Sequence, residues 1–255
     1  MILTNYLKFH PEHKDLIIRA RDIIENELSF SSFKILYFIN PAQEKIIQDI
    51  CNHYSNINCY FISYFINTEY HLAILSKNKI IINFDDYISL FTFKFNNKFI
   101  TIRHQDILGA LLNLNIQREY LGDIYIIENN AYFEVSKSLE NYIFDNLSRI
   151  NKVNLDLKVI HNNIEIIRYY QNEEMLINSL RLDNVVKGIT NLSSNKTREL
   201  ILSNVVKVNY LYQDNHSLII NVNDIISIKG YGKFIIDQYR LTKKAKYRVA
   251  YRKYK

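Results

Sequence analysis

The 255-residue chain has no tryptophan, two prolines, five glycines and two cysteines, and these shortages exclude several classes of site. Two thiols, Cys51 and Cys59, cannot build the disulfide framework of a small secreted domain, and they lack the paired Cys-x-x-Cys spacing of a zinc site. The few glycines form no phosphate-cradling loop and no nucleophile elbow. We therefore expect neither a metal nor a cofactor.

Long apolar runs are also missing. No run approaches the ~18 residues that a membrane-spanning helix needs. The first residues, MILTNYLKFHPEHKD, turn polar too early for the apolar region of a secretory signal. The expectation from these absences is a cytoplasmic protein with reduced thiols and no membrane contact, and we expect it to be a monomer.

The charge is unevenly distributed along the chain. Residues 181–255 hold 15 Lys or Arg and 5 Asp or Glu, whereas residues 1–180 hold 17 and 21, and the net charge is +6. An acidic-to-neutral body followed by a basic third is typical of a polyanion-binding module joined to something else. The alternative is that these cations only keep the surface soluble.

The periodicity predicts an α+β protein of three small domains. They are an N-terminal α/β domain over 1–83, a middle domain over 84–163, and a linker plus C-terminal domain over 164–255. In the first domain, helices are predicted over 11–28, with Pro11 in the first turn, and over 40–54, capped by Asn40. Strands are predicted over 58–65 and 71–76.

The middle domain reads as strand, helix, hairpin, helix and strand. The predicted elements are a strand with an Asn-Asn turn over 91–99, a helix over 103–115, a hairpin over 122–136, a helix over 138–150 and a strand over 153–160. This order predicts a ferredoxin-like, RRM-like sheet with two helices on one face. Many RNA-binding modules share that topology, but so do many unrelated proteins.

The C-terminal domain follows a segment, 161–178, that we predict to be the hinge. Leu182, Val185, Val186 and Ile189 have the spacing of one helix face, and Ser193 is a plausible cap for a second helix. Strands are predicted over 205–212, 217–222 and 224–230, with at least one more in 232–253.

The outer faces of these two helices and the following strands carry many cations. The start of the second helix, Ser193–Lys196, offers free backbone N–H groups and a positive dipole end, which suit phosphate. The predicted RNA contacts are Arg181, Lys187, Ser193, Asn195, Lys196, Arg198, Lys207, Lys229 and Lys233. Further contacts are expected from Arg103, His104, Arg118, Lys243, Lys244 and Arg248.

Four tyrosines interleave with the C-terminal cations. Tyr231, Tyr239, Tyr247 and Tyr251 have the chemistry to stack on bases or riboses. They have equally the chemistry to pack the sheet, and the sequence leaves both readings open.

Several of these runs resemble a known RNA-binding module. The chain resembles the alpha-L RNA-binding domain over roughly 179–235. The runs that carry the resemblance are Ser179-Leu180-Arg181-Leu182-Asp183, Asn191-Leu192-Ser193 with Lys196, and Gly230-Tyr231-Gly232-Lys233-Phe234. That domain also occurs in a small-subunit ribosomal protein, in tyrosyl-tRNA synthetases and in pseudouridine synthases.

The rest of the chain extends the resemblance to the YlmH family. The runs that carry it are RHQDILGALL (103–112), IQRE (116–119), LGDI (121–124) and FINPAQE (38–44). The resemblance implies an N-terminal α/β domain, an RRM-like middle domain and a C-terminal alpha-L domain. It also implies a bacterial, cytosolic protein that binds large-subunit rRNA and P-site peptidyl-tRNA during rescue of stalled large subunits.

The chain departs from the family pattern at two positions. Ser194 stands where the family usually has a phosphate-contacting Arg, and Arg198, one turn further on, is a candidate to compensate. Asn204 stands where Gly is common, and Asn tolerates a left-handed turn.

Two other functional classes are weighed against RNA binding. An RNA-modifying enzyme would use Asp183, which lies in an Arg-Leu-Asp triplet like that of pseudouridine synthases but without their flanking residues, or a set of His104, Asp106 and Arg118. These residues also suit helix capping and the helix dipole. A protein-interaction adaptor would dock a partner on the acidic body and use the basic end for encounter. We predict a protein that is not an enzyme.

Overall fold

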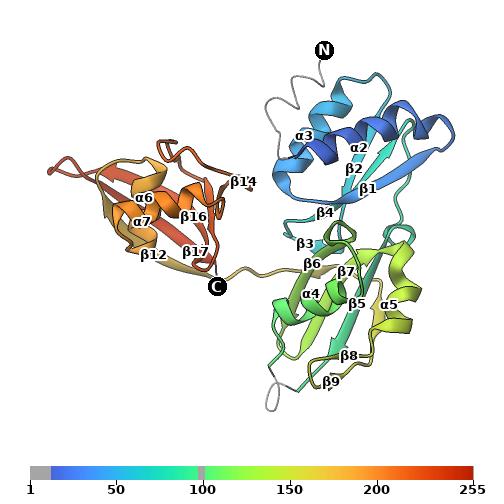
Figure 1. Ribbon diagram of the computed structural model, residues 1–255. Coiled ribbons are helices and arrows are strands. Elements are labelled where there is room, and N and C mark those ends of the chain that lie inside the picture. The colour runs from blue at the N-terminus through green and yellow to red at the C-terminus, as the bar shows by residue number, and fades with distance from the viewer. Residues whose placement is uncertain (1–12, 97–100, 255) are drawn as a thin grey trace. The chain divides into compact units, whose positions relative to one another are not determined.

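The computed structural model describes residues 13–96 and 101–254, and it divides the chain into two compact units, 1–166 and 167–255 (Figure 1). Both units mix helices with antiparallel sheet, so the predicted α+β class is confirmed. The further division of the first unit at residue 83 stays a prediction. No helix within the described ranges is long and apolar enough to span a bilayer.

The first unit begins with two helices over a three-stranded sheet. Helices α2 (Lys14–Glu25) and α3 (Pro41–Asn52) pack on one face of the sheet, whose order is β1-β4-β2 (Figure 1). Its strands are β1 (Phe33–Ile39), β2 (Asn58–Ile62) and β4 (His71–Ser76).

The start of α3 is the one that the sequence predicts. The Asn40 side chain accepts hydrogen bonds from the backbone of Ala42 and Gln43 at 3.0 and 3.1 Å, and the Gln43 side chain accepts one from Asn40 N–H. This reciprocal cap satisfies N–H groups that a helix start leaves open. The predicted start of the preceding helix at Pro11 lies outside the described residues.

Strand β1 is absent from the sequence prediction. Its residues, FKILYFI, form a short apolar run between Ser31-Ser32 and Asn40-Pro41. Such a run with turn residues at both ends is the signal of a buried strand.

The middle sheet has the predicted ferredoxin-like strand order. Strands β5 (Ile88–Lys94), β6 (Leu121–Ile127), β7 (Asn130–Ser136) and β10 (Lys158–Ile160) run antiparallel in the order β10-β5-β7-β6. Its two helices, α4 (His104–Asn113) and α5 (Glu140–Asn146), pack on the same face of the sheet.

Several predicted bounds in this part of the chain are wrong. The helix predicted to reach residue 150 ends at Asn146, because 149–150 form strand β8 (Arg149–Ile150) with β9 (Val153–Asn154). The strand predicted over 153–160 is therefore divided between β9 and β10. The predicted Asn-Asn turn includes residue 97, which lies outside the described residues. Short 3-10 turns occupy Glu27–Ser29, Phe84–Asp86, Arg118–Tyr120 and Lys137–Leu139.

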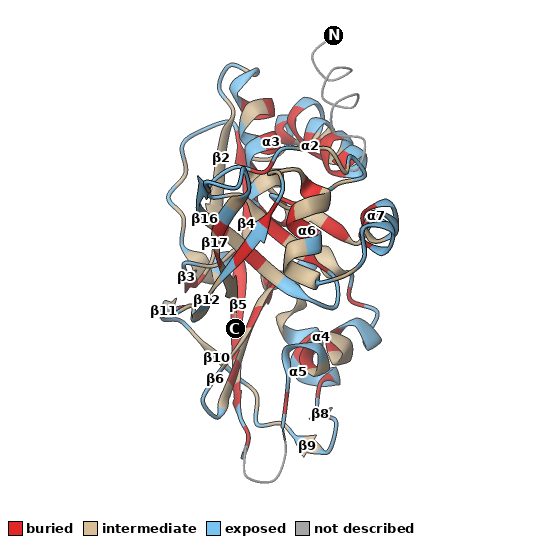
Figure 2. Cartoon of the chain, turned by 90° about the vertical axis from the view of Figure 1, so that its left-hand side faces the viewer, coloured by how far each residue is buried: buried red, intermediate tan, exposed pale blue. Residues whose placement is uncertain are grey.

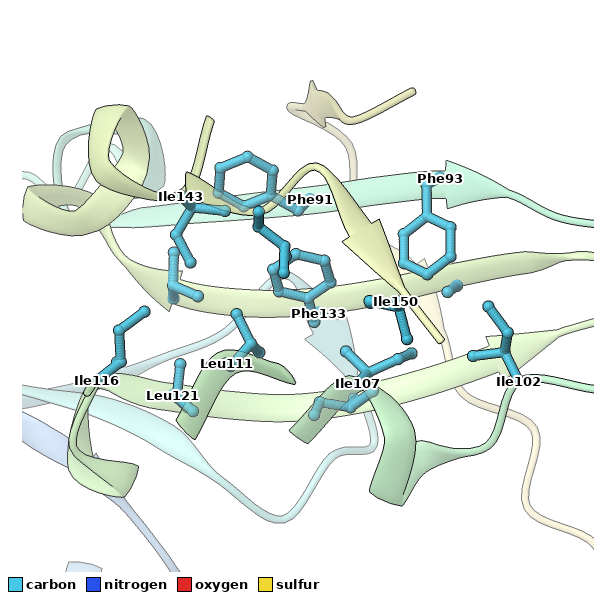
Figure 3. Packing of buried hydrophobic residues seen from close by; sticks show 14 of the residues in the cluster. Phe91, Phe93, Ile102, Ile107, Leu111, Ile116, Leu121, Phe133, Ile143 and Ile150 are labelled. Atoms are coloured by element: carbon cyan, nitrogen blue, oxygen red, sulfur yellow. The ribbon is translucent and has the colours of Figure 1, made fainter. Parts of the chain in front are cut away.

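The core of the middle sheet lies between its strands and its helices (Figure 3). The rings of Phe91 and Phe133 stack with their centroids 5.2 Å apart, and Ile107 and Leu111 of α4 are fully buried in the same cluster. Ile143 joins them from α5. Burying such side chains is the main stabilising contribution to this part of the fold.

The opposite face of the middle sheet packs against the first sheet. A second cluster joins Phe38 and Leu72 of β1 and β4 to Leu90 of β5, and the partly buried Tyr132 of β7 packs against it. Strands β4 and β5 are accordingly buried along most of their length (Figure 2). Near the end of the unit, β11 (Ile164–Glu165) pairs in parallel with β3 (Phe65–Ile66).

Gly122 lies at this contact between the sheets, and it has no room for a side chain. A Cβ atom added there would lie 2.8 Å from both Glu134 Cβ and Phe38 Cε1. We expect Gly122→Ala to lower the free energy of unfolding by about 1–3 kcal/mol. The matched control is Gly109→Ala inside α4, where a Cβ meets open space and should stabilise the helix by up to about 1 kcal/mol. Denaturant midpoints measure both, and equal midpoints would contradict this packing.

The second unit is a six-stranded antiparallel sheet in the order β12-β17-β16-β15-β13-β14. The strands are β12 (Tyr170–Ile177), β13 (Val206–Val208), β14 (Leu211–Tyr212), β15 (Ile225–Ile228), β16 (Gly232–Leu241) and β17 (Tyr247–Tyr254). Helices α6 (Leu182–Thr190) and α7 (Ser194–Leu202) cover one face. Asn204 has the left-handed φ of 55° that its side chain was expected to tolerate.

Two expectations for this unit are corrected. The predicted hinge, 161–178, contains the boundary between the two units after residue 166, but it is too long, because it also contains β11 of the first unit and the whole of β12, which pairs with β17 over eight residues. Only a few residues therefore lie between the two paired strands. The strand predicted over 217–222 is not formed, apart from a single bridge between Ile219 and Arg181.

Candidate nucleic-acid interface

The turn between α6 and α7 is tightly fixed by backbone and hydroxyl contacts. Asn191 ends α6 in a left-handed conformation, with φ 58°, and its N–H donates to the Lys187 carbonyl at 2.9 Å. Ser193 caps α7 by accepting a hydrogen bond from Lys196 N–H at 3.4 Å, and the buried Thr197 hydroxyl donates to the Ser193 carbonyl at 3.0 Å. The start of α7 is thus held with its remaining backbone donors facing outward.

Cations surround this helix start. Lys187, from the last turn of α6, donates from Nζ to Ser194 Oγ at 3.0 Å. Lys196 and Arg198 are exposed on α7, and Asn195 is exposed beside them. Within the described part of the chain, neither Lys196 nor Arg198 has an acidic partner. We call Lys187, Ser193, Asn195, Lys196 and Arg198 the helix face.

Lys187 supplies a positive charge beside Ser194, the position where the chain departs from the family pattern. The Ser194 hydroxyl accepts a hydrogen bond from the Lys187 ammonium, so a positive charge still lies at the position for which the resemblance implies Arg. Lys187, rather than Arg198, is therefore the residue that contacts Ser194. A lysine ammonium is a point charge and lacks the two-pronged geometry of a guanidinium on phosphate.

Arg181 is not counted in the helix face, because its guanidinium is already bound. It donates to both oxygens of Asp183 at 3.2 and 2.9 Å and contacts His216 Nδ1 at 3.1 Å. Partial burial acts to raise the pKa of Asp183. The hydrogen bonds and charge of Arg181, together with the hydrogen bonds from Asn184, nevertheless hold this pKa below its ordinary value. Asp183 is thus an ionised partner of Arg181 at the start of α6.

Lys207 and Lys233 do not lie with the helix face. Lys207 alternates with the buried Val206 and Val208, and Lys233 precedes the buried Phe234. Because successive strand residues point to opposite faces, both lysines lie on the sheet face away from α6 and α7. Lys229 is exposed just after β15, where the chain turns into β16.

The tip of the β16–β17 hairpin forms another basic segment. Lys243 and Lys244 are exposed in a turn that is closed by the Thr242 hydroxyl, which donates to the Lys246 carbonyl at 2.9 Å. Arg248 follows on β17 and pairs with Glu174 of β12 at 3.4 Å.

The four tyrosines have different environments. Tyr251 is buried, and its hydroxyl donates to Glu173 at 2.6 Å; burial, followed by this contact, raises its pKa. Tyr239 and Tyr247 pack edge to face at 6.0 Å, and Tyr231 lies exposed in the β15–β16 turn. Packing is therefore the role of Tyr251, while Tyr231 and Tyr239 have exposed surface.

The candidate contacts of the middle sheet are occupied within the first unit. Arg103 pairs with Asp106 at 3.5 Å, and the Arg118 guanidinium lies 4.9 Å from the Tyr70 ring and donates to the Leu121 carbonyl. Burial, and then the charge of Arg118, lowers the pKa of His104. Of these contacts, the one between Arg118 and Tyr70 joins the segment before β6 to the residue before β4, whereas the Arg103–Asp106 pair lies within the start of α4.

Two acidic residues at the contact between the sheets were missed by sequence reasoning. Asp123 accepts hydrogen bonds from Thr68 and from the backbone N–H groups of Glu69 and Tyr70, the latter two at 3.1 Å. Glu134 is fully buried and accepts hydrogen bonds from Ser63 Oγ at 2.9 Å and Tyr64 N–H at 2.5 Å. For Glu134, the only available signal in the sequence was a lone Glu inside an otherwise apolar strand.

Part of the middle sheet remains open as a cavity of about 660 Å³. Lys94, Tyr132 and Lys158 line it from three strands, with Asn162 and Asn163 beyond β10. Lys158 pairs with Asp156 at 3.2 Å. The cavity offers cations, amides and the rings of Phe93 and Tyr132, which can contact a nucleotide, beside the carboxylates of Asp156 and Glu165.

Comparison with known proteins gives three consistent matches. Residues 83–163 match a family model described as "Putative RNA-binding domain in YlmH". The "Ribosome-associated protein quality control protein P2" of Bacillus subtilis (strain 168) is 26% identical over 227 residues, which cover 87% of this chain and 88% of that protein. The solved structure "Cell division protein ylmH from Streptococcus pneumoniae" matches with a TM-score of 0.50 and 26% identity, over 58% of this chain and 91% of that chain.

Residues 83–163 are a YlmH-type RNA-binding domain, and the chain is similar to YlmH proteins beyond it. In this YlmH-type domain, the LGDI run has a structural explanation, since Gly122 permits the close approach of the two sheets and Asp123 binds the turn at 68–70. The residues of the helix face, in contrast, leave most of their polar groups directed to the surface.

Proposed function

We propose that this protein binds the large ribosomal subunit through structured rRNA, together with P-site peptidyl-tRNA, and acts in quality control of stalled subunits. It does so as a three-domain monomer in the cytoplasm, with no catalytic step. The observation that carries the proposal is the helix face, where Lys187, Lys196 and Arg198 surround the start of α7. The printed name of the Bacillus subtilis relative supports the pathway, and the family model supports RNA as the ligand.

The helix face suits phosphate better than it suits protein carboxylates. A helix start presents several N–H donors and a positive dipole end to one anion, and flanking cations add charge-assisted hydrogen bonds. Folded RNA presents phosphates at regular spacing, so shape and phosphate geometry would dominate recognition over base sequence.

Binding to purified large subunits should therefore weaken steeply with salt. Each neutralised phosphate adds roughly 0.7–0.9 to the slope of log affinity against log salt concentration, so the three cations of the helix face alone imply a slope of at least about 2. A salt titration of subunit binding measures this slope. A flat titration would contradict RNA binding and favour the adaptor hypothesis.

Restoring the arginine that Ser194 replaces is expected to strengthen binding. In Ser194→Arg the guanidinium joins Lys187 at the start of α7 and gains two-pronged contact with phosphate. We expect a gain in affinity of roughly threefold to tenfold and a salt slope steeper by about 0.9. Filter binding with large-subunit RNA measures both quantities.

The control for that gain is Ser203→Arg, which adds the same charge at the far end of α7. Ser203 is exposed beyond the last turn of the helix. It should leave the affinity within about twofold, because long-range charge is screened at physiological salt. An equal gain from both variants would show that charge alone matters and that the helix start has no special role.

An RNA-modifying activity is not favoured by the geometry at Asp183. The carboxylate is engaged by Arg181 and Asn184, which hold it as a structural partner. If Asp183→Asn abolished a modification while leaving RNA affinity unchanged, the non-catalytic proposal would be wrong.

A further inference from the structure

The sheet face opposite α6 and α7 carries a continuous row of aromatic and cationic side chains. The strand register aligns Tyr212, Lys207, Ser227 and Lys233 across β14, β13, β15 and β16. Since Phe234 pairs with Lys253, the next pair is Lys233 with Tyr254, and Tyr254 pairs with Tyr170 of β12. One side chain from each of the six strands thus joins a row, which we call the tyrosine–lysine row.

The contacts along the row confirm this register. The Lys207 ammonium lies 4.3 Å from the centroid of the Tyr212 ring, and the Lys233 ammonium lies 5.4 Å from that of Tyr254. The rings of Tyr254 and Tyr170 meet edge to face at 5.1 Å. At about 4.8 Å between strands, the row extends for roughly 24 Å.

Neighbouring residues extend the same chemistry. The Tyr210 ring lies 4.7 Å from Lys233, and the Arg252 guanidinium lies 4.7 Å from the Tyr170 ring. Asp237 and Glu174 also lie at this face, but Arg252 and Arg248 neutralise them at 2.8 and 3.4 Å. The row is therefore positive, and its rings are partly accessible: the Tyr212 side chain is the most open, with the residue 51% exposed.

Rings between cations are the chemistry that binds unpaired nucleotides. Phosphates of a single strand follow the cations, while unstacked bases stack on aromatic side chains. A lysine that is already held over a ring also loses less side-chain freedom when it meets a phosphate. A duplex would present no unstacked base to such rings.

We infer that the tyrosine–lysine row is a second RNA site, which binds an unpaired RNA segment on the sheet face away from the helix face. The inference rests on the proposed function and deepens it, since the C-terminal unit then holds structured RNA on its helices and a single strand on its sheet. A row crossing all six strands gives Lys207 and Lys233 a common role that the helix face does not provide for them.

The test measures the affinity of the full chain for fluorescent oligouridine of about 12 nucleotides, which falls within the site sizes of single-strand binders. The row variant combines Tyr212→Ala with Lys207→Gln. We expect it to lose roughly tenfold or more in affinity, with a salt slope lower by about 0.7. Tyr212→Phe should stay within about twofold of wild type, because it keeps the stacking ring.

A matched variant of the helix face separates the two sites. Lys187→Gln/Lys196→Gln/Arg198→Gln should lose binding to large subunits but keep binding to oligouridine within about threefold. The thermal midpoint of each variant reports folding, and Tyr212→Ala alone decides the test if the double variant is unstable, since Tyr212 is exposed.

Three results would overturn the inference. They are a wild type that fails to bind oligouridine, a row variant that binds it as well as wild type, and a helix-face variant that loses it entirely. Any of these, with subunit binding still lost in the helix-face variant, would leave the proposed function standing. Unchanged subunit binding in the helix-face variant would instead remove the proposed function.

Discussion

Lys187→Glu/Lys196→Glu/Arg198→Glu is expected to lower the affinity for large-subunit RNA by roughly two to three orders of magnitude. Each lost charge-assisted contact is worth about 1–1.5 kcal/mol at a surface site, and the new carboxylates repel phosphate. The three side chains surround one helix start, so they act on the same stretch of RNA. The salt slope should fall by about 2–3 because three phosphate contacts disappear.

The control for this variant applies the same change in net charge to the first unit. Lys45, Lys77 and Lys79 are all exposed there, and Lys45→Glu/Lys77→Glu/Lys79→Glu alters the overall charge equally. We expect it to reduce the affinity by less than about threefold at physiological salt, because distant charges are screened. Fluorescence anisotropy across a salt series compares the two variants. Equal losses would mean that total charge, and not the helix face, decides binding.

The stability of the first unit is expected to fall as pH rises from about 5 to 8. Burial raises the pKa of Glu134 to about 8, although the hydrogen bonds from Tyr64 and Ser63 oppose the shift. The folded chain therefore keeps this proton up to about pH 8, whereas the unfolded chain releases it near the ordinary value of 4.5. Between these values folding takes up a proton, so the free energy of unfolding decreases with pH, by at most about 1.4 kcal/mol per pH unit.

Glu134→Gln should remove that dependence. The amide carbonyl can still accept hydrogen bonds from Ser63 and Tyr64, and a neutral side chain needs no proton to stay buried. At pH 8 the variant should be more stable than wild type by a few kcal/mol, and near pH 5 the two should differ little. Denaturant unfolding at several pH values, followed by a probe in the first unit, gives the comparison.

A matched control for Glu134 is Asp145→Asn on α5. Asp145 is exposed, so the substitution removes a carboxylate without touching the contact between the sheets. It should leave the slope of stability against pH close to that of wild type. A wild-type profile that rises between pH 5 and 8 would contradict the buried, protonated state of Glu134.

Local periodicity and capping were enough to predict much of this fold. The cap at Asn40 and the two helices after Arg181 follow from neighbouring residues, and the topology of the middle sheet was inferred from the order of its elements along the chain. The polar sequence of β12 indicates a hinge because β12 is an edge strand, and edge strands have polar residues where a central strand has apolar ones. Only Met175 and Ile177 show its buried face.

The site was predicted as a set of residues but not as an arrangement. The basic helix start was visible in the sequence, whereas Lys207 and Lys233 were predicted as RNA contacts together with Lys187 without a face being assigned to them. Their alternation with buried neighbours was available as a signal for the opposite face. The contact of Arg181 with His216 and the hydrogen bonds of the buried Glu134 join residues up to 71 positions apart, which local patterns do not encode.

The most direct measurement is co-sedimentation with purified large subunits, with and without bound peptidyl-tRNA. Wild type should pellet with the subunits and more so when peptidyl-tRNA is bound, while Lys187→Glu/Lys196→Glu/Arg198→Glu should remain in the supernatant. If wild type and variant pellet alike, the helix face does not hold RNA, and the binding must come from the middle sheet or the N-terminal helices instead.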